Sequence, residues 1–268
     1  MKNEDIRWFV FCSGCVLLKE PASKGMPHSI PMSPQPPIPL KPWTSMQELP
    51  DTPDGTSQRA YTISIPTCIE GYIFIGLRES YRRLCHEDYL MAGKASELLY
   101  WDANTRYCGV CGAPMRRATN ISKLCTSCGK EVWPQVAPAI IVRIRRRLST
   151  GEEQILLVHA RNFRRSEMYG LVAGFVETGE TLEQCVEREV WEETHLRIKN
   201  ISYFASQPWP YPCGIMIGFT ADYDSGQLTP QQEEISQAAW FTKENMPAIP
   251  EKLSIARMLI DDWLGNML

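Results

Sequence analysis

Several acidic side chains with helical spacing lie between residues 174 and 196, just after a glycine. Glu189 and Glu193 are four residues apart, so one helix face would carry both carboxylates, and Glu192 flanks the same patch. Like charges at this spacing repel each other by about 0.2–0.5 kcal/mol per pair. A hard divalent cation such as Mg²⁺ removes that cost because it prefers carboxylate and phosphate oxygens. The alternative is a solvated acidic face, which isolated Glu–Glu pairs usually form.

The residues before and within this segment predict the helix that positions the glutamates. Thr181 followed by Gln184 fits a capping box, in which each side chain bonds the backbone N–H of the other residue. Leu182, Val186 and Val190 recur every four residues and predict the buried stripe. The glutamates would therefore project from a neighbouring face of the same helix.

A second group of residues that could bind a ligand consists of four cysteines: Cys108, Cys111, Cys125 and Cys128. Two Cys-x-x-Cys pairs at this spacing are typical of a closed, tetrahedral structural zinc site, with one Zn²⁺ per chain. The alternative is two disulfides, which would need an oxidising compartment. A closed site leaves no open coordination position, so we expect this zinc to build a small ribbon and to take no part in catalysis.

A third group is the segment from Ser206 to Pro212, in which proline alternates with bulky residues. Its prolines fix φ and remove backbone donors, so the sequence predicts a stiff loop or an edge strand. Trp209 and Tyr211 would be presented there at little entropic cost, and aromatic rings suit a planar base. The alternative is an edge segment that only covers the core.

The acidic segment resembles the signature of the Nudix hydrolases. The matching positions are Gly174, Glu180 six residues later, and the run from Arg188 to Glu193. One position departs from the pattern: His195 stands where the family has a glycine that closes the helix with positive φ. Histidine tolerates that conformation, so we expect the departure to cost stability and to leave the chemistry intact. The resemblance implies hydrolysis of a nucleoside diphosphate joined to another group, with Mg²⁺ or Mn²⁺.

The proline–aromatic segment is similar to the marker of the NADH pyrophosphatase subfamily of Nudix hydrolases, in which a four-cysteine ribbon precedes the Nudix domain. The subfamily implies hydrolysis of NAD(H) to NMN(H) and AMP, and removal of the NAD cap from RNA 5′ ends to leave a 5′-monophosphate. Gly214 departs from the marker, which ends in serine; the missing hydroxyl removes a hydrogen bond worth about 1 kcal/mol. Another dinucleotide or a nucleoside-diphosphate sugar is the alternative substrate. A non-enzymatic zinc-ribbon module that binds nucleic acid ranks lower, because all the glutamates are present.

The resemblance also implies roles for individual residues. Two or three Mg²⁺ or Mn²⁺ ions would be held by the Ala173 backbone carbonyl, Glu189, Glu193 and Glu234, with Glu233 as a register alternative for Glu234. Glu192 or a neighbour would act as the general base, and Arg188 would pair with acidic groups of the helix or the loop and hold them in place.

The substrate contacts follow from the same resemblance. Phe175 would stack on the nicotinamide, and Trp133 would reach the site from the partner chain of a homodimer; the alternative for Trp133 is packing within the ribbon. An active site shared in this way would be lost in a monomer. The implied substrate-binding residues are Arg78, Trp133, Phe175, Gln207, Pro208, Trp209, Pro210, Tyr211, Pro212, Cys213, Gly214 and Ala256.

Composition and pattern set the wider organisation. A chain of 268 residues with 44% hydrophobic composition can bury a sizeable core, and its net charge of -3 argues against a generic nucleic-acid coat. The expected fold class is α+β: a Nudix α/β/α sandwich with a mixed sheet, preceded by the ribbon and a small β-rich domain. The expected domains are residues 1–100, 101–135 and 136–268.

The N-terminal region carries its own signals. Ser13-Gly14 between two apolar runs predicts a two-residue hairpin turn. Nine prolines between residues 21 and 50 predict an extended loop outside the core. Strands are expected at 61–65 and 72–75. Helices are expected at 87–100 and 251–267. No membrane span and no clean secretion signal are visible, which with free thiols and a zinc ribbon favours the cytoplasm.

Overall fold

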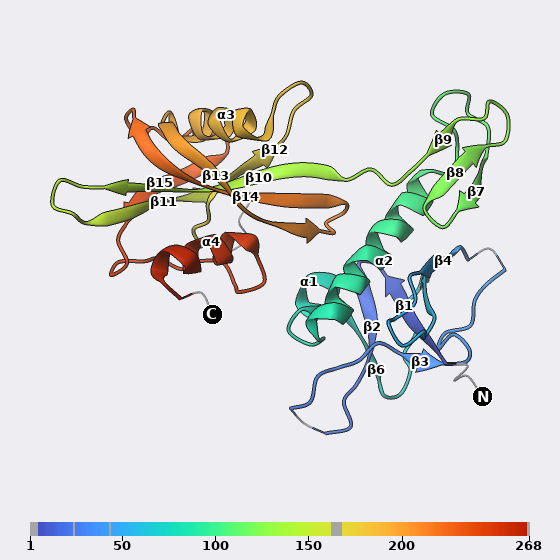
Figure 1. Cartoon of the computed structure of the whole chain (residues 1–268). Helices are drawn as coiled ribbons and strands as arrows, with labels where there is room; N and C mark the ends of the chain where they lie inside the picture. Colours follow the sequence, from blue (N-terminus) through green and yellow to red (C-terminus); the bar gives the residue numbers. More distant parts are fainter. Residues whose placement is uncertain (1–4, 24, 43, 162–167, 267–268) are drawn as a thin grey trace. The chain divides into compact units, whose positions relative to one another are not determined.

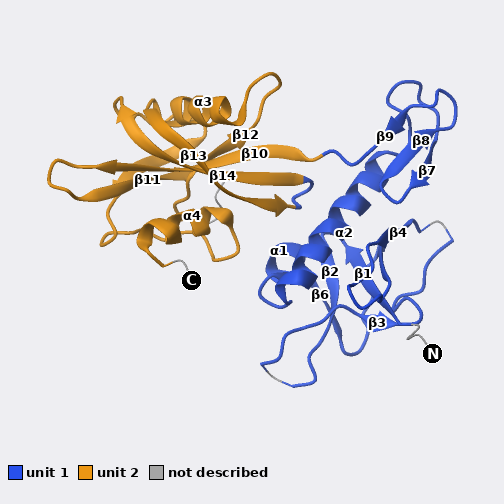
Figure 2. Ribbon diagram, in the orientation of Figure 1, with its two compact units in different colours: residues 1–135, 210–213 blue, residues 136–209, 214–268 orange. Residues whose placement is uncertain are grey.

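The computed structural model describes residues 5–23, 25–42, 44–161 and 168–266. The chain divides into two compact units (Figure 2). Unit 1 comprises residues 1–135 and 210–213, and unit 2 comprises residues 136–209 and 214–268. The turn at 210–213 therefore groups with unit 1 although the strands on either side of it belong to unit 2. The division of residues 1–135 into an N-terminal domain and a separate ribbon stays a prediction.

Unit 2 is built on a six-stranded mixed sheet. The strand order is β13-β14-β10-β11-β15, and β12 pairs with β10. Strand β10 runs parallel to β14 and antiparallel to both β11 and β12. The strands are β10 (Ala137–Arg147), β11 (Glu153–Ala160), β12 (Val172–Phe175), β13 (Arg197–Trp209), β14 (Gly214–Ser225) and β15 (Ile235–Phe241).

Two helices, α3 (Leu182–Thr194) and α4 (Ile255–Leu264), cover opposite faces of this sheet (Figure 1). The alternation along β10 shows why: Ile140 is buried in the cluster that includes α3, and Ile141 in the cluster that includes α4. Successive side chains of a strand point to opposite faces, so the stretch of β10 that is covered on both faces, Ala139 to Val142, is apolar at every position. The expected α/β/α sandwich with a mixed sheet is confirmed.

Helix α3 has the ends that the sequence predicts. The Gln184 N–H donates to Thr181 Oγ1 at 3.2 Å, and the Thr181 N–H donates to Gln184 Oε1 at 2.8 Å, which completes the capping box. Such a cap stabilises a helix by about 1 kcal/mol. At the other end His195 adopts the left-handed conformation with φ +57°. Val186 and Val190 are fully buried. These features fix which helix face carries the glutamates.

Unit 1 contains a second six-stranded sheet, with the order β4-β5-β1-β2-β6 and β3 paired to β1. The predicted hairpin turn is confirmed: Ser13 and Gly14 both have positive φ, and Cys12 pairs with Cys15. Strand β1 runs parallel to β5. The strands are β1 (Ile6–Cys12), β2 (Cys15–Lys19), β3 (Met32–Ser33), β4 (Met46–Leu49), β5 (Gln58–Thr62) and β6 (Tyr72–Gly76).

The prediction that residues 21–50 lie outside the core is wrong. Strands β3 and β4 fall within this segment, and β4 pairs with β5. Ile38 is buried, where its carbonyl accepts a hydrogen bond from the Tyr61 hydroxyl at 2.7 Å. Prolines remove single donors, but the residues between them still pair and pack. The strand expected at 61–65 lies instead at Gln58–Thr62.

Two helices and three short strands complete unit 1. Helix α1 spans Leu77–Ser80 and helix α2 spans His86–Asn104, longer than the 87–100 expected. The ribbon strands are β7 (Met115–Thr119), β8 (Ser122–Cys125) and β9 (Glu131–Val132).

In unit 2, helix α4 is shorter than the predicted 251–267, because Ser254 caps its start and Gly265 ends it with φ +79°. Met267 lies outside the described residues. None of the helices in the described ranges is long and apolar enough to cross a membrane.

Candidate active site and zinc centre

The four ribbon cysteines come together as predicted. Their Sγ atoms all lie within 4.8 Å of one another, with Cys108–Cys128 at 3.6 Å and Cys111–Cys125 at 3.5 Å. A tetrahedral Zn²⁺ with Zn–S bonds of about 2.3 Å would place its ligands about 3.8 Å apart, so the geometry fits zinc.

Backbone groups favour the thiolate form of two of the four ribbon cysteines, Cys108 and Cys125. The Cys128 and Ser127 N–H groups point at Cys125 Sγ from 3.4 Å and lower the pKa of Cys125 to about 6. The Val110 N–H does the same for Cys108 and lowers its pKa. Thiolates are the form that ligates metals, so the turns prepare the site for its ion.

The glutamates of α3 are less exposed than a solvated acidic face would be. Glu189 and Glu193 are only 9% and 5% exposed, whereas Glu192 is exposed. Burial, together with Glu189, Glu234 and Glu192, raises the pKa of Glu193 to about 8. Glu193 Oε2 is buried and has no hydrogen-bond partner among the described residues. An orphaned buried carboxylate oxygen costs free energy unless a cation compensates it, so these residues fit a divalent ion.

Glu234 faces the same cluster from the segment before β15. Its charge raises the pKa of both Glu189 and Glu193, after the larger effect of burial. The neighbouring Glu233 instead accepts a hydrogen bond from the Gln231 side chain at 3.1 Å. Glu234 is therefore the better candidate of the two as a third carboxylate ligand.

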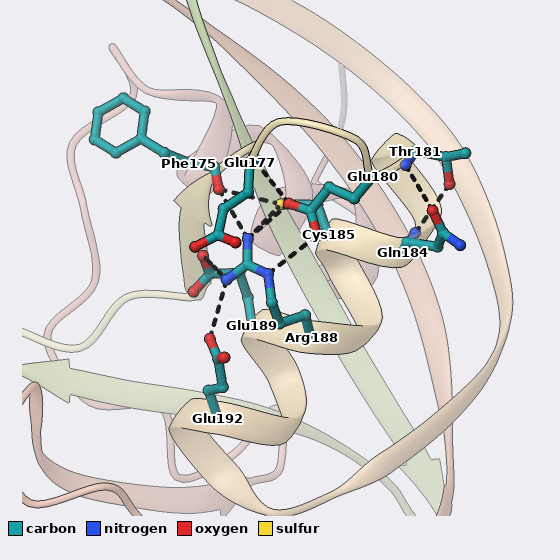
Figure 3. A network of polar contacts seen from close by, with 9 residues as sticks. All are labelled: Phe175, Glu177, Glu180, Thr181, Gln184, Cys185, Arg188, Glu189 and Glu192. Atoms are coloured by element: carbon teal, nitrogen blue, oxygen red, sulfur yellow. Dashed lines mark hydrogen bonds and ion pairs between the residues drawn. The ribbon is translucent and has the colours of Figure 1, made fainter.

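Arg188 organises the acidic groups around it (Figure 3). Its guanidinium donates to Glu180 at 2.7 and 3.0 Å, to Glu189 at 2.9 Å and to Glu192 at 3.0 Å, and also to the Phe175 carbonyl at 3.0 Å. Bidentate pairing lowers the pKa of Glu180 to about 2. The predicted role of Arg188 in holding the acidic groups is confirmed, and it also ties α3 to the end of β12.

Gly174 is required by the position of Glu189. A Cβ atom added at Gly174 would lie 1.9 Å from Cδ and Oε1 of Glu189. No side chain fits there, so the glycine of the signature allows the carboxylate to lie directly against the β12 backbone. The neighbouring residue, Ala173, is the one whose carbonyl is predicted to be a metal ligand.

Two of the predicted stacking aromatics are exposed. Phe175 at the end of β12 is 67% exposed, and its ring points away from the Arg188 network (Figure 3). Trp133, which follows β9 in unit 1, is 49% exposed. Large exposed aromatic rings are available to stack on a planar ligand or on another chain.

The segment 207–209 forms the end of the edge strand β13, as its prolines predict. The Gln207 side chain is engaged by backbone: it donates to the Leu253 carbonyl at 2.7 Å and accepts from the Ile255 N–H at 2.8 Å. Gln207 therefore fixes the start of α4. Leu253 lies 46 residues after Gln207, so the local sequence around Gln207 does not predict this contact.

The turn at 210–213 packs within unit 1 against α1 and α2. The Tyr211 hydroxyl lies 2.9 Å from that of Tyr89, and the Arg78 guanidinium lies 4.9 Å from the centre of the Tyr211 ring. Pro210 packs on Gly93, where an added Cβ would meet Pro210 Cγ at 3.0 Å. Sequence reasoning missed Tyr89 and Gly93, because nothing near them signals a contact with residues more than a hundred positions later.

The structure thus brings some predicted site residues together within each unit. In unit 2, Glu189, Glu193 and Glu234 converge beside Gly174. Ala256 lies on the buried face of α4, within the core. In unit 1, Arg78 meets Tyr211. Unit 2 holds Ala173, Phe175, Gln207, Pro208, Trp209, Gly214 and Ala256; unit 1 holds Arg78, Trp133, Pro210, Tyr211, Pro212, Cys213 and the four ribbon cysteines.

Comparison with known proteins supports the assignment of a zinc ribbon and of a Nudix domain. Residues 136–262 match the NUDIX domain family, and residues 103–132 match the NADH pyrophosphatase zinc ribbon domain. The chain is 38% identical over 216 residues to a protein named NAD-capped RNA hydrolase NudC from Stutzerimonas stutzeri, covering 80% of this chain and 76% of the relative.

Two further proteins with the same name are similar to this chain. The one from Photobacterium profundum is 46% identical over 177 residues, covering 65% of this chain and 64% of the relative. The one from Pectobacterium atrosepticum is 43% identical over 187 residues, covering 68% and 70%. The chain therefore belongs to the Nudix hydrolases, and within them to the NADH pyrophosphatase (NudC-type) subfamily.

Proposed function

We propose that this protein hydrolyses the pyrophosphate of NAD(H) to NMN(H) and AMP, and that it removes the NAD cap from RNA 5′ ends to leave a 5′-monophosphate. The observation that carries the proposal is the buried, unpartnered Glu193 oxygen beside Glu189 and Glu234. Its context is a chain whose relatives are named NAD-capped RNA hydrolases.

The residues of unit 2 would divide the work of hydrolysis. The Ala173 carbonyl, Glu189, Glu193 and Glu234 would hold two or three Mg²⁺ or Mn²⁺ ions. Such ions, when bound, supply positive charge that activates water and stabilises the leaving phosphate. Arg188 fixes the orientation of Glu189 and Glu192 through its hydrogen bonds. Glu192, exposed at the edge of the cluster, would take the proton of the attacking water.

The exposed aromatics support a site that recognises a planar ring. Phe175 would stack on the nicotinamide, and Trp133 would be contributed by the second chain of a homodimer. The remaining contacts implied by the subfamily resemblance stay assigned to the rest of the dinucleotide. A shared site requires the dimer, so an enforced monomer is expected to be inactive. Reduced thiolates for zinc fit a cytoplasmic protein.

The test is a panel of substrates with Mn²⁺ or Mg²⁺: NADH, NAD-capped RNA, ADP-ribose and diadenosine polyphosphates. The proposal expects NMNH and AMP from NADH, and NMN with 5′-monophosphate RNA from capped RNA. Preferential cleavage of ADP-ribose or of a diadenosine polyphosphate would assign a different Nudix specificity. A folded, metal-loaded protein that cleaves none of them would contradict the proposal and favour a binding module.

A further inference from the structure

Unit 1 contains a cavity of about 980 Å³. Its lining comes from the proline-rich segment, the residues after β5, the C-terminal end of α2 and the ribbon strands β7 and β8. The residues assigned to the proposed reaction are not among those that line this cavity. The volume is at the upper end of the ~300–1,000 Å³ typical of small-molecule sites, so it has room for more than one nucleotide.

The lining is positively charged in a protein whose net charge is -3. Lys41, Arg106, Arg117 and Lys123 line the cavity, and Asp102 is the one acidic residue among the described residues that line it. A concave surface of one sign concentrates ligands of the opposite sign. The occupant is therefore expected to be an anion.

The floor of the cavity is a fixed arrangement of charges. Lys123 Nζ and Arg117 Nη2 both lie 3.0 Å from Asp102 Oδ1, so two cations share one carboxylate. Lys123 also donates to the carbonyls of Asp102 and Thr105 at the end of α2, and Arg117 donates to the Met46 carbonyl. These bonds hold both side chains in place. Because two cations share one carboxylate, the group keeps a net charge of one positive unit.

The rim carries groups that can contact a ligand directly. Arg106 and three residues with hydroxyl groups, Thr62, Ser64 and Thr67, are exposed and line the cavity. Ile65, between these hydroxyls, is 68% exposed. The cations suit the phosphates of a nucleic-acid strand, the hydroxyls suit its ribose hydroxyls, and the aliphatic side chains suit its bases.

We propose that this cavity binds the ribose–phosphate chain of single-stranded RNA. This deepens the proposed function and rests on it, since capped RNA presents such a chain beyond its cap. A single strand is preferred to a duplex because its sugars and bases can enter a concave site, whereas a duplex offers a regular outer surface. Binding driven by such contacts weakens with salt, with a slope of about −0.7 per phosphate for a single strand.

The experiment measures binding of a fluorescein-labelled, uncapped 5′-monophosphate single-stranded RNA to the full-length protein by fluorescence anisotropy, at several salt concentrations. The variants are Arg106→Glu and Ser64→Glu, both at exposed positions of the rim. The matched control is Arg116→Glu: Arg116 is exposed on β7, next in sequence to Arg117, but does not line the cavity.

Both rim variants are expected to weaken RNA binding several-fold, with the salt slope for Arg106→Glu reduced by about 0.7, whereas Arg116→Glu stays near wild type. The KM for NAD-capped RNA should rise in parallel, while the KM and kcat for NADH stay unchanged.

The proposal would be overturned if all three variants weakened RNA binding equally, or if neither rim variant weakened it. Displacement of the RNA by AMP at equal concentration would show a mononucleotide site instead. Binding is measured without turnover, so failure of the proposed hydrolysis would be seen separately, with NADH.

Discussion

In the ribbon of unit 1, four Sγ atoms lie within 4.8 Å of one another. In α3 of unit 2, by contrast, Glu189 and Glu192 accept hydrogen bonds from Arg188, and Glu193 is buried with one oxygen unpartnered among the described residues. The two regions differ in how they are held. Backbone N–H groups point at Cys108 and Cys125 and favour the ionised thiolates. In contrast, burial and neighbouring carboxylates disfavour ionised Glu193.

The zinc of the ribbon therefore belongs to the fold, whereas the divalent ions proposed at the glutamates belong to the reaction. A closed, pre-organised thiolate cluster binds its ion tightly, and the free energy of metal binding adds to the free energy of unfolding. A cluster of carboxylates that repel one another binds cations best when the phosphates of a substrate complete the coordination. The following changes should therefore separate stability from turnover.

The largest effect is expected from Cys125→Ser. Structural Zn²⁺ contributes about 10–16 kcal/mol of binding free energy in small zinc modules, so loss of one ligand should remove the ion and unfold the ribbon. Zinc per chain, measured by plasma mass spectrometry, should fall from one to near zero. Cys68→Ser, at an exposed cysteine outside the cluster, should keep its zinc. Full zinc content in Cys125→Ser would refute the assignment.

Glu193→Gln should leave zinc content unchanged and strongly lower turnover. Replacing a proposed ligand of the catalytic ions is expected to lower kcat by on the order of 10²–10³-fold, as for the loss of one strong transition-state contact. The measurement is NADH hydrolysis under saturating Mn²⁺, with folding checked by circular dichroism. Glu187→Gln, an exposed position on the same helix, serves as the control. Wild-type activity in Glu193→Gln would contradict the proposed site.

Gly174→Ala tests the position of Glu189 without changing a charge. The new Cβ would occupy the place of the carboxylate, so Glu189 has to move, and a displacement of about 1 Å costs on the order of 10² in rate. Steady-state kinetics at several Mn²⁺ concentrations should show lower kcat and weaker Mn²⁺ activation. At Gly76 an added Cβ meets nothing within 4 Å and φ is −53°, so Gly76→Ala should be neutral.

The smallest effect is a pH dependence of stability without added Mg²⁺ or Mn²⁺. The pKa of Glu193 is about 8 in the folded chain, above its ordinary value of 4.5. The folded state therefore holds more protons than the unfolded state between these values, and the free energy of unfolding should fall as pH rises through that window. Melting temperatures from pH 5 to 8.5 should show this fall, and Glu193→Gln should flatten it. An unchanged slope in the variant would show that Glu193 is not the cause.

Local features of both regions could be predicted from the sequence. The capping box at Thr181, the positive φ at His195 and the turn at Ser13-Gly14 depend on neighbours within a few residues. The zinc cluster depends on two Cys-x-x-Cys turns, which the pairing of β7 with β8 brings together over a short stretch of chain. These predictions are confirmed because short-range geometry decides them.

Long-range contacts could not be predicted in this way. The burial of Ile38 depends on Tyr61, and the turn carrying Tyr211 depends on Tyr89, which lies 122 residues earlier. The Gln207 side chain looks like a ligand contact in its motif, yet two backbone groups near α4 engage it. Each of these depends on how distant segments pack.

The most direct test is anomalous diffraction from crystals grown with Mn²⁺ and a non-hydrolysable NAD analogue, recorded at the manganese and zinc edges. We expect one zinc peak among the four Sγ atoms, and separate manganese peaks against the carboxylates of Glu189 and Glu193 and the Ala173 carbonyl. A bound analogue with no manganese peak at these carboxylates would contradict this expectation.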